Sequence, residues 1–188
     1  MRPISWTFSL ATLTLVLAGS QALRSRASAV EAPSHAERAK RGEYLVTIAG
    51  CHDCHSPKID AQMTPDVTRP LSGRPATTIP PLQGEGEIRA SLDVTAFAGP
   101  WGNSFAANLT PDRDTGLGAR YTEEAFLKTI RTGKKPEGEN LAPPMPWPVY
   151  RQMTDEDLKA VYAYLTTLKP VKNFARAATV PGPSRATK

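Results

Sequence analysis

Both cysteines of the chain and two of its three histidines lie within the six residues GCHDCH at positions 50–55. Cys51 and Cys54 stand three positions apart, and His55 follows directly. Two thiols at this spacing can each form a thioether with a porphyrin vinyl group, while the next residue presents an imidazole to the iron. A CxxC pair followed by His is the pattern of covalent c-type haem attachment. The motif therefore predicts one haem c, held by Cys51 and Cys54, with His55 as an iron ligand.

Three other uses of the cysteine pair fit the sequence less well. A thioredoxin-like redox pair is expected near a βαβ pattern, and little strand signal surrounds this motif. Structural zinc takes four ligands, which here would have to include the distant His35. A disulfide across two residues closes a very small loop and removes little chain entropy. His52 occupies a free position of the motif, so we expect it, like His35, at the surface.

A haem iron with one histidine ligand has a second axial position, and His/Met ligation is common in electron-transfer haems. Met153 precedes a helix cap and is expected to pack as an apolar staple. Met63 lies only a few residues beyond the motif. Met145 lies in APPMPWP, where the flanking prolines hold the backbone extended. A stiff loop suits a thioether that must meet an iron, so Met145 is predicted as the sixth ligand, with core filling as the alternative.

The first helix is predicted from a capping box. Ser34 and Glu37 stand three residues apart, which is the spacing of the reciprocal N-terminal cap. Tyr44, Leu45 and Ile48 fall on one face at helical spacing and are expected to be buried. This helix is expected to run straight into the cysteine motif.

Two more helices are predicted further along the chain. Thr122 caps one that stops at Gly133, and Thr154 caps another that ends before Pro170. Residues 56–120 hold no sustained helical or alternating pattern, and the chain has 18 prolines and 13 glycines. We expect this segment to be mostly loop, organised by a large buried group because such long loops are unusual.

The N-terminus has the pattern of an export signal. Arg2 precedes an apolar run over residues 6–17, and Ala27-Ser28-Ala29 fits a cleavage site, so residues 1–29 are predicted to be a signal peptide. The apolar run is shorter than the roughly 20 residues that cross a bilayer, so no membrane span is expected after cleavage. One domain over 30–172 and a flexible tail over 173–188 are expected to follow.

The charge balance excludes one class of partner. The chain has 23 basic and 18 acidic residues, a formal charge of +5. Removing residues 1–29 takes away three arginines and no acid, which leaves 20 basic against 18 acidic residues, or +2. Without a cluster of Lys or Arg, this balance does not indicate nucleic-acid binding.

Four segments together resemble bacterial class I c-type cytochromes, in particular the single-haem domains of cytochrome c subunits of periplasmic dehydrogenases. They are GCHDCH, NLTPDRDTGLG, YTEEAFLKTIRTGK and MPWPVYRQMTDEDLKAVYAYL, and the likeness covers roughly residues 36–171. It implies an all-α, cytochrome c-like fold in which three to five helices and long ordered loops surround one covalent haem. It also implies that the first and last helices cross, with Gly42 and Tyr44 against Tyr162 and Leu165.

The same resemblance implies further site residues. Asn108 and Trp101 are expected to bind a haem propionate or line the pocket. A proline carbonyl, predicted to be that of Pro111, is expected to accept a hydrogen bond from the other ring nitrogen of His55.

The predicted function is transfer of single electrons between redox protein partners in the periplasm, one of which can be a dehydrogenase. No catalytic residue is expected, so the chain is predicted not to be an enzyme in itself. Two alternatives remain: a haem enzyme or ligand sensor with an open sixth position, and an obligate electron-transfer subunit of a dehydrogenase complex.

Overall fold

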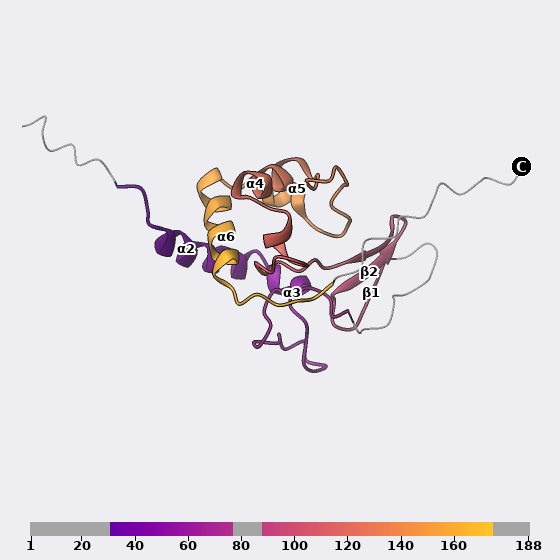
Figure 1. Ribbon diagram of the computed structural model, residues 1–188. Helices are drawn as coiled ribbons and strands as arrows, with labels where there is room; N and C mark the ends of the chain where they lie inside the picture. The colour runs from indigo at the N-terminus through magenta and orange to yellow at the C-terminus, as the bar shows by residue number, and fades with distance from the viewer. Residues whose placement is uncertain (1–30, 77–87, 175–188) are drawn as a thin grey trace, which may run out of the picture. The chain divides into compact units, whose positions relative to one another are not determined.

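The computed structural model describes residues 31–76 and 88–174 (Figure 1). The predicted signal peptide and all but two residues of the predicted tail therefore lie outside the described residues. The described residues from Ser34 onward form one compact unit. Its elements, in chain order, are α2 (His35–Ile48), α3 (Cys51–His55), β1 (Arg89–Ala90), β2 (Ala96–Gly99), β3 (Gly102–Phe105), the 3₁₀ helix η2 (Leu117–Ala119), α4 (Glu123–Thr132), α5 (Trp147–Tyr150) and α6 (Asp155–Thr167).

The three helices predicted from their caps are confirmed. The Ser34 hydroxyl oxygen accepts a 3.3 Å bond from the Glu37 amide, and the Glu37 carboxylate accepts a 2.8 Å bond from the Ser34 amide. Thr122 and Thr154 cap α4 and α6 through their hydroxyl groups. Gly133 ends α4 in the left-handed conformation, with φ of 71°, which glycine adopts without steric cost.

Helices α2 and α6 pack against each other, and Figure 1 shows them side by side. Gly42 makes the close approach possible, because a Cβ at that position would overlap the carbonyl oxygen of Ala160. The crossing at Gly42 agrees with the resemblance, but Tyr44 is 55% exposed. Ile48 is also exposed, so of the three residues expected on the buried face only Leu45 is buried, together with Val46. The buried face of α2 is therefore the one that carries Gly42, Leu45 and Val46, because the small Gly42 sets the contact with α6.

One apolar core joins these helices to the loop that follows the cysteine motif. The rings of Phe126 in α4 and Tyr162 in α6 lie 5.6 Å apart between centroids. The Tyr162 hydroxyl donates a 2.9 Å hydrogen bond to the carbonyl oxygen of Tyr121. The largest buried members of the core are Leu45, Val46, Leu71, Leu117, Phe126, Ile130, Leu158, Val161 and Leu165.

The described chain is not all-α, because residues 89–105 form a three-stranded antiparallel sheet in the order β1-β2-β3. This segment was expected to be loop. Its strands have two to four residues and are rich in Gly and Ala, so they carry no alternating pattern long enough to be recognised. Strands β2 and β3 form a hairpin closed by Pro100 and Trp101, in which Gly99 pairs with Gly102.

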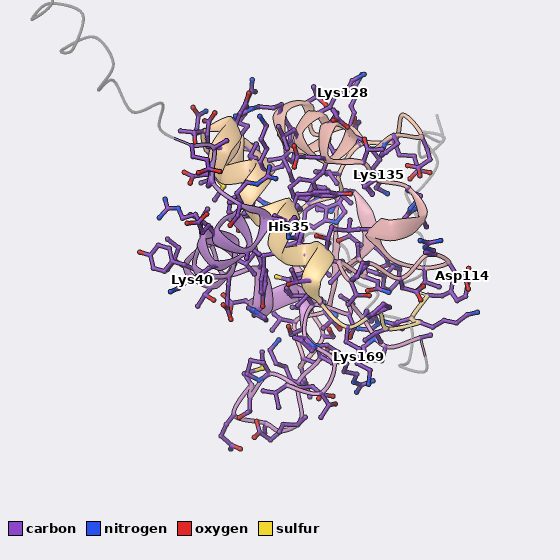
Figure 2. All side chains as sticks on the ribbon, turned by 60° about the vertical axis from the view of Figure 1, so that its left-hand side comes forward. His35, Lys40, Asp114, Lys128, Lys135 and Lys169 are labelled. Carbon is purple, nitrogen blue, oxygen red and sulfur yellow. The ribbon has the colours of Figure 1, made fainter. Side chains whose placement is uncertain are left out.

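The outer surface carries scattered charge. In Figure 2, Lys40, Lys128 and Lys169 project from separate edges of the view rather than from one face. Within the described ranges, no helix has both the length and the apolar character needed to span a membrane.

Candidate functional site

The cysteine motif forms its own short helix, α3, rather than the end of α2. Between them Gly50 adopts the left-handed conformation, with φ of 67°, so the expected continuous helix is broken at this point. A Cβ at Gly50 would lie 2.8 Å from the Asp53 carboxylate. The break gives α3 its own direction, and its single turn carries Cys51, Cys54 and His55.

The two thiols of α3 are free and partly exposed. Burial raises the pKa of Cys51 to about 11 and also raises that of Cys54. A redox-active CxxC pair needs the opposite shift, since thiolate is its reactive form. The raised pKa values therefore disfavour the thioredoxin-like interpretation, and the two free thiols are available to one ligand.

His55 is held in one tautomer. Its Nδ1 lies 2.8 Å from the carbonyl oxygen of Ala107. A carbonyl can only accept, so Nδ1 carries the proton and Nε2 keeps a lone pair. Burial lowers the pKa of His55, which favours the neutral ring that a metal requires. The predicted acceptor, Pro111, is wrong: the carbonyl belongs to Ala107, four residues earlier, because the strand β3 leads the chain past the ring at that point.

Two loop segments, residues 71–74 and 106–109, lie beside His55. The Gly73 amide donates a 2.7 Å bond to the carbonyl oxygen of His55, and the Arg74 amide donates a 3.0 Å bond to Ala106. The Leu71 amide donates to the buried Ser56 hydroxyl oxygen at 2.9 Å. Residues 71–74 and 106–109 therefore run side by side next to the imidazole.

Met145 lies in a segment that the structure attaches to the start of α3. The Tyr150 hydroxyl, in α5, donates a 2.6 Å bond to the carbonyl oxygen of Ala49. Burial, followed by the neighbouring Cys51 and Cys54, raises the pKa of Tyr150 to about 12. Met145 itself is partly buried and packs against the same core as Cys51. The other two methionines differ, since Met153 packs against the core as expected and Met63 lies in the loop after α3.

Trp101 lies at the tip of the hairpin and connects it to the loop of Met145. Its indole nitrogen donates to the Ser104 hydroxyl oxygen at 3.3 Å, and Ser104 donates to the carbonyl oxygen of Pro143 at 2.5 Å. Trp101 is thus linked through Ser104 to Pro143, two residues before Met145. Sequence reasoning missed Ser104, which makes the connection, because a single serine in a loop carries no pattern.

Asn108 is 2% exposed, and its amide group is fully engaged within the protein. Its nitrogen donates to Thr115 at 3.0 Å and to the carbonyl oxygen of Val171 at 2.7 Å. Its oxygen accepts from the amide and the hydroxyl of Thr110. A bond from Asn108 to a haem propionate would have to replace one of these, so in this structure the side chain joins the segment after α6 to the loop before η2.

Lys58 is a further residue that sequence reasoning missed. Its ammonium donates to the carbonyl oxygens of His52, Asp53 and Ser56 at 3.2, 2.9 and 2.6 Å. A cation at a helix C-terminus stabilises its unpaired carbonyls, and a lysine three residues past the motif is a signal that could have been noticed. The ring of His52 contacts Ser56 at 2.9 Å rather than pointing at a ligand position.

The donor set at this site fits a covalently bound haem. Two neutral thiols and a neutral imidazole with a fixed tautomer lie on one helical turn, and the helix that follows Met145 is hydrogen-bonded to Ala49, at the junction of α2 with that turn. Thioether formation needs the thiols, and iron ligation needs the imidazole lone pair.

Comparison with known proteins finds no matching family model. Among curated proteins, the chain is 33% identical over 171 residues to the fructose dehydrogenase cytochrome subunit of Gluconobacter japonicus, covering 90% of this chain and 29% of that protein. It is 33% identical over 145 residues to the gluconate 2-dehydrogenase cytochrome c subunit of Pantoea cypripedii, covering 77% and 26%. It is 32% identical over 133 residues to the cytochrome c subunit of a quinone alcohol dehydrogenase of Gluconobacter oxydans, covering 70% and 22%. The chain spans less than a third of the length of each.

Proposed function

The chain is a homologue of the cytochrome c subunits of bacterial dehydrogenases, and from that relationship we propose that it binds one haem c and transfers single electrons through it. The homology confirms the resemblance noted in the sequence. One observation of the structure carries the proposal: His55 has its Nδ1 proton fixed on Ala107 at 2.8 Å, on the same helical turn as two free thiols.

Cys51 and Cys54 would hold the haem through thioethers, and His55 would ligate the iron through Nε2. Met145 would supply the second protein ligand to the iron, which would raise the potential relative to His/His ligation. Bound haem c supplies a one-electron iron couple. The two cysteines of the 188 residues suffice for one such attachment.

The chain's own residues keep the site rigid and dry. The Gly73 amide holds the backbone carbonyl of His55, and the Ala107 carbonyl oxygen accepts from its ring Nδ1, so both the backbone and the ring of His55 are fixed. The core around Leu71 and Leu165 excludes water, because both side chains are almost fully buried. A site that moves little when its charge changes favours electron transfer. The site is built on a cytochrome c-like arrangement of α2, α4 and α6, to which a small sheet is added.

The second candidate is an obligate subunit of a dehydrogenase, and the names of the relatives favour it. Each is a cytochrome subunit of a fructose, gluconate or alcohol dehydrogenase. In this form the chain accepts electrons from a dehydrogenase partner in the periplasm and passes them to another redox protein. Co-purification with a dehydrogenase activity from the native cells separates this role from that of a freely diffusing carrier.

Mass spectrometry of the protein exported from a cell with haem c maturation tests the attachment. A thiol adds across each vinyl group, forming a carbon–sulfur bond while the thiol hydrogen moves to carbon, so the chain gains the mass of one haem. The variant Cys51→Ala/Cys54→Ala should lack this gain. A wild-type chain that releases its haem on denaturation would contradict the proposal.

A further inference from the structure

Arg74 is a buried arginine next to the proposed haem site. It is 7% exposed and follows Gly73, whose amide binds the carbonyl oxygen of His55. Its guanidinium lies 3.8 Å from the Asp93 carboxylate and 3.4 Å from the Thr95 hydroxyl. It also lies 5.8 Å from the centroid of the Phe105 ring. A buried charge is costly unless it is paired, so this arrangement connects residues 71–74 firmly to the β2–β3 hairpin.

The carboxylate of Asp93 is itself fixed. It accepts hydrogen bonds from the Ser91 and Thr95 hydroxyl groups at 2.6 and 2.7 Å. The backbone continues the connection, because the Ala106 amide donates to the carbonyl oxygen of Thr95 at 2.8 Å. Ala106 in turn accepts from the Arg74 amide at 3.0 Å, which closes the path from Arg74 through Asp93 and Thr95 back to Arg74.

The residue after Ala106 is Ala107, whose carbonyl oxygen accepts from Nδ1 of His55. The position of this oxygen therefore depends on the closed path just described. We propose that the Arg74–Asp93 pair positions the Ala107 carbonyl against His55 and thereby sets the basicity of the iron ligand. The inference rests on the proposed function, since His55 must be an iron ligand for its basicity to matter.

The midpoint potential of the haem is expected to change in one direction. A hydrogen bond from the second ring nitrogen to a carbonyl raises the basicity of a histidine ligand. A more basic ligand stabilises ferric iron over ferrous iron. Loosening the carbonyl should therefore raise the midpoint potential.

Charge alone would also shift the potential, so the variants must separate the two effects. Arg74→Gln removes a positive charge and Asp93→Asn removes a negative one, and each single change moves the local field. The double variant Arg74→Gln/Asp93→Asn leaves the net charge unchanged, so a shift in it reports positioning. Arg74→Lys keeps the positive charge but loses the planar guanidinium group. It provides the test of positioning if the double variant does not fold.

A matched control lies in the same loop. Asp66 and Arg69 form an ion pair at 2.6 Å, and within the described residues neither side chain forms a hydrogen bond to residue 106 or 107. The double variant Arg69→Gln/Asp66→Asn also preserves net charge. It should keep the wild-type potential.

The test measures the midpoint potential of the haem-loaded proteins and, by NMR of the ferrous form, the exchange rate of the His55 Nδ1 proton. In the Arg74/Asp93 double variant we expect the reduced-to-oxidised ratio at fixed ambient potential to rise about threefold, a positive shift of ~28 mV at 59 mV per tenfold for one electron. The Nδ1 proton should exchange faster. Arg74→Lys should shift both quantities in the same direction by less.

Wild-type potential and exchange in both the double variant and Arg74→Lys would overturn the inference. A shift equal to that of the Asp66/Arg69 control would also overturn it. The covalent haem mass reports separately on the proposed function. If no haem is attached, that function fails, and the exchange rate of the His55 Nδ1 proton, measured by NMR of the haem-free chain, still tests whether the pair positions Ala107.

Discussion

The hydroxyl of Tyr150 donates a 2.6 Å hydrogen bond to the carbonyl oxygen of Ala49, two residues before Cys51. The bond spans a hundred positions of sequence and attaches the segment after Met145 to the start of the cysteine helix. The segment that follows the proposed sixth ligand is thus fixed to the C-terminal cap of α2, which leads through Gly50 into the helix that carries the proposed fifth.

Tyr150→Phe removes this bond and leaves the Ala49 carbonyl without its partner. We expect the protein to lose about 1 kcal/mol of unfolding free energy. We also expect weaker methionine ligation, seen as faster binding of carbon monoxide to the ferrous protein. Tyr44→Phe is the control, because Tyr44 is on the exposed side of α2 and should leave both measurements unchanged.

Gly42→Ala should disrupt the contact between α2 and α6. The added methyl group overlaps the carbonyl oxygen of Ala160, a backbone atom that cannot rotate away. Overpacking of this kind costs about 1–3 kcal/mol, so urea denaturation should show a lower midpoint. The neighbouring Glu43→Ala, on the exposed face, should show little change, and equal stability of the two variants would contradict the close crossing.

Asn108→Ala should destabilise the fold because it leaves the Thr110 amide without its partner and leaves the Val171 carbonyl with only the 3.4 Å bond from the Thr110 hydroxyl. A loss of about 2–3 kcal/mol in unfolding free energy is expected from buried groups left unsatisfied. Urea denaturation of Asn108→Ala measures this loss, and Asn140→Ala, at an exposed position, is the control. A midpoint unchanged from wild type would show that the network around Asn108 adds no stability.

The protein should lose stability in acid partly through Asp66. Hydrogen bonds from Thr68 and then from Arg69 hold the pKa of the Asp66 carboxyl below its ordinary value. A lowered folded pKa gives stability that is present above the unfolded value of about 3.9 and is lost as the pH falls through the folded value. The urea concentration at the denaturation midpoint should therefore be lower at about pH 3 than at about pH 6, and this difference should be smaller in Asp66→Asn. An identical fall in the variant would exclude Asp66 as a contributor.

Local signals in the sequence predicted the helices well. The caps at Ser34, Thr122 and Thr154 are short-range patterns, and each depends on residues within one turn. The cysteine motif likewise predicted three site residues on one turn, because residues three and four positions apart lie close together on a helix. Gly42 entered through the resemblance, and its contact with Ala160 is seen only in the folded chain.

The hairpin and the acceptor of the His55 proton could not be predicted in the same way. Strands of two to four residues are too short to carry a recognisable alternating pattern, and long-range contacts such as those of Arg74 and Ser104 help to hold them in place. The His55 acceptor is a backbone carbonyl, which any residue supplies, so its identity depends on the path of the chain. The resemblance implied a proline carbonyl, predicted to be that of Pro111, while the chain leaving strand β3 brings the Ala107 carbonyl to the ring.

The account depends most directly on Met145 as the second axial ligand, and the absorption spectrum of Met145→Ala tests it. The wild-type protein should be low-spin in both oxidation states, and the variant should become high-spin and bind carbon monoxide readily when reduced. Met153→Ala, which removes a methionine from the core without touching the iron, should remain low-spin. A low-spin Met145→Ala protein with the wild-type spectrum would contradict the account.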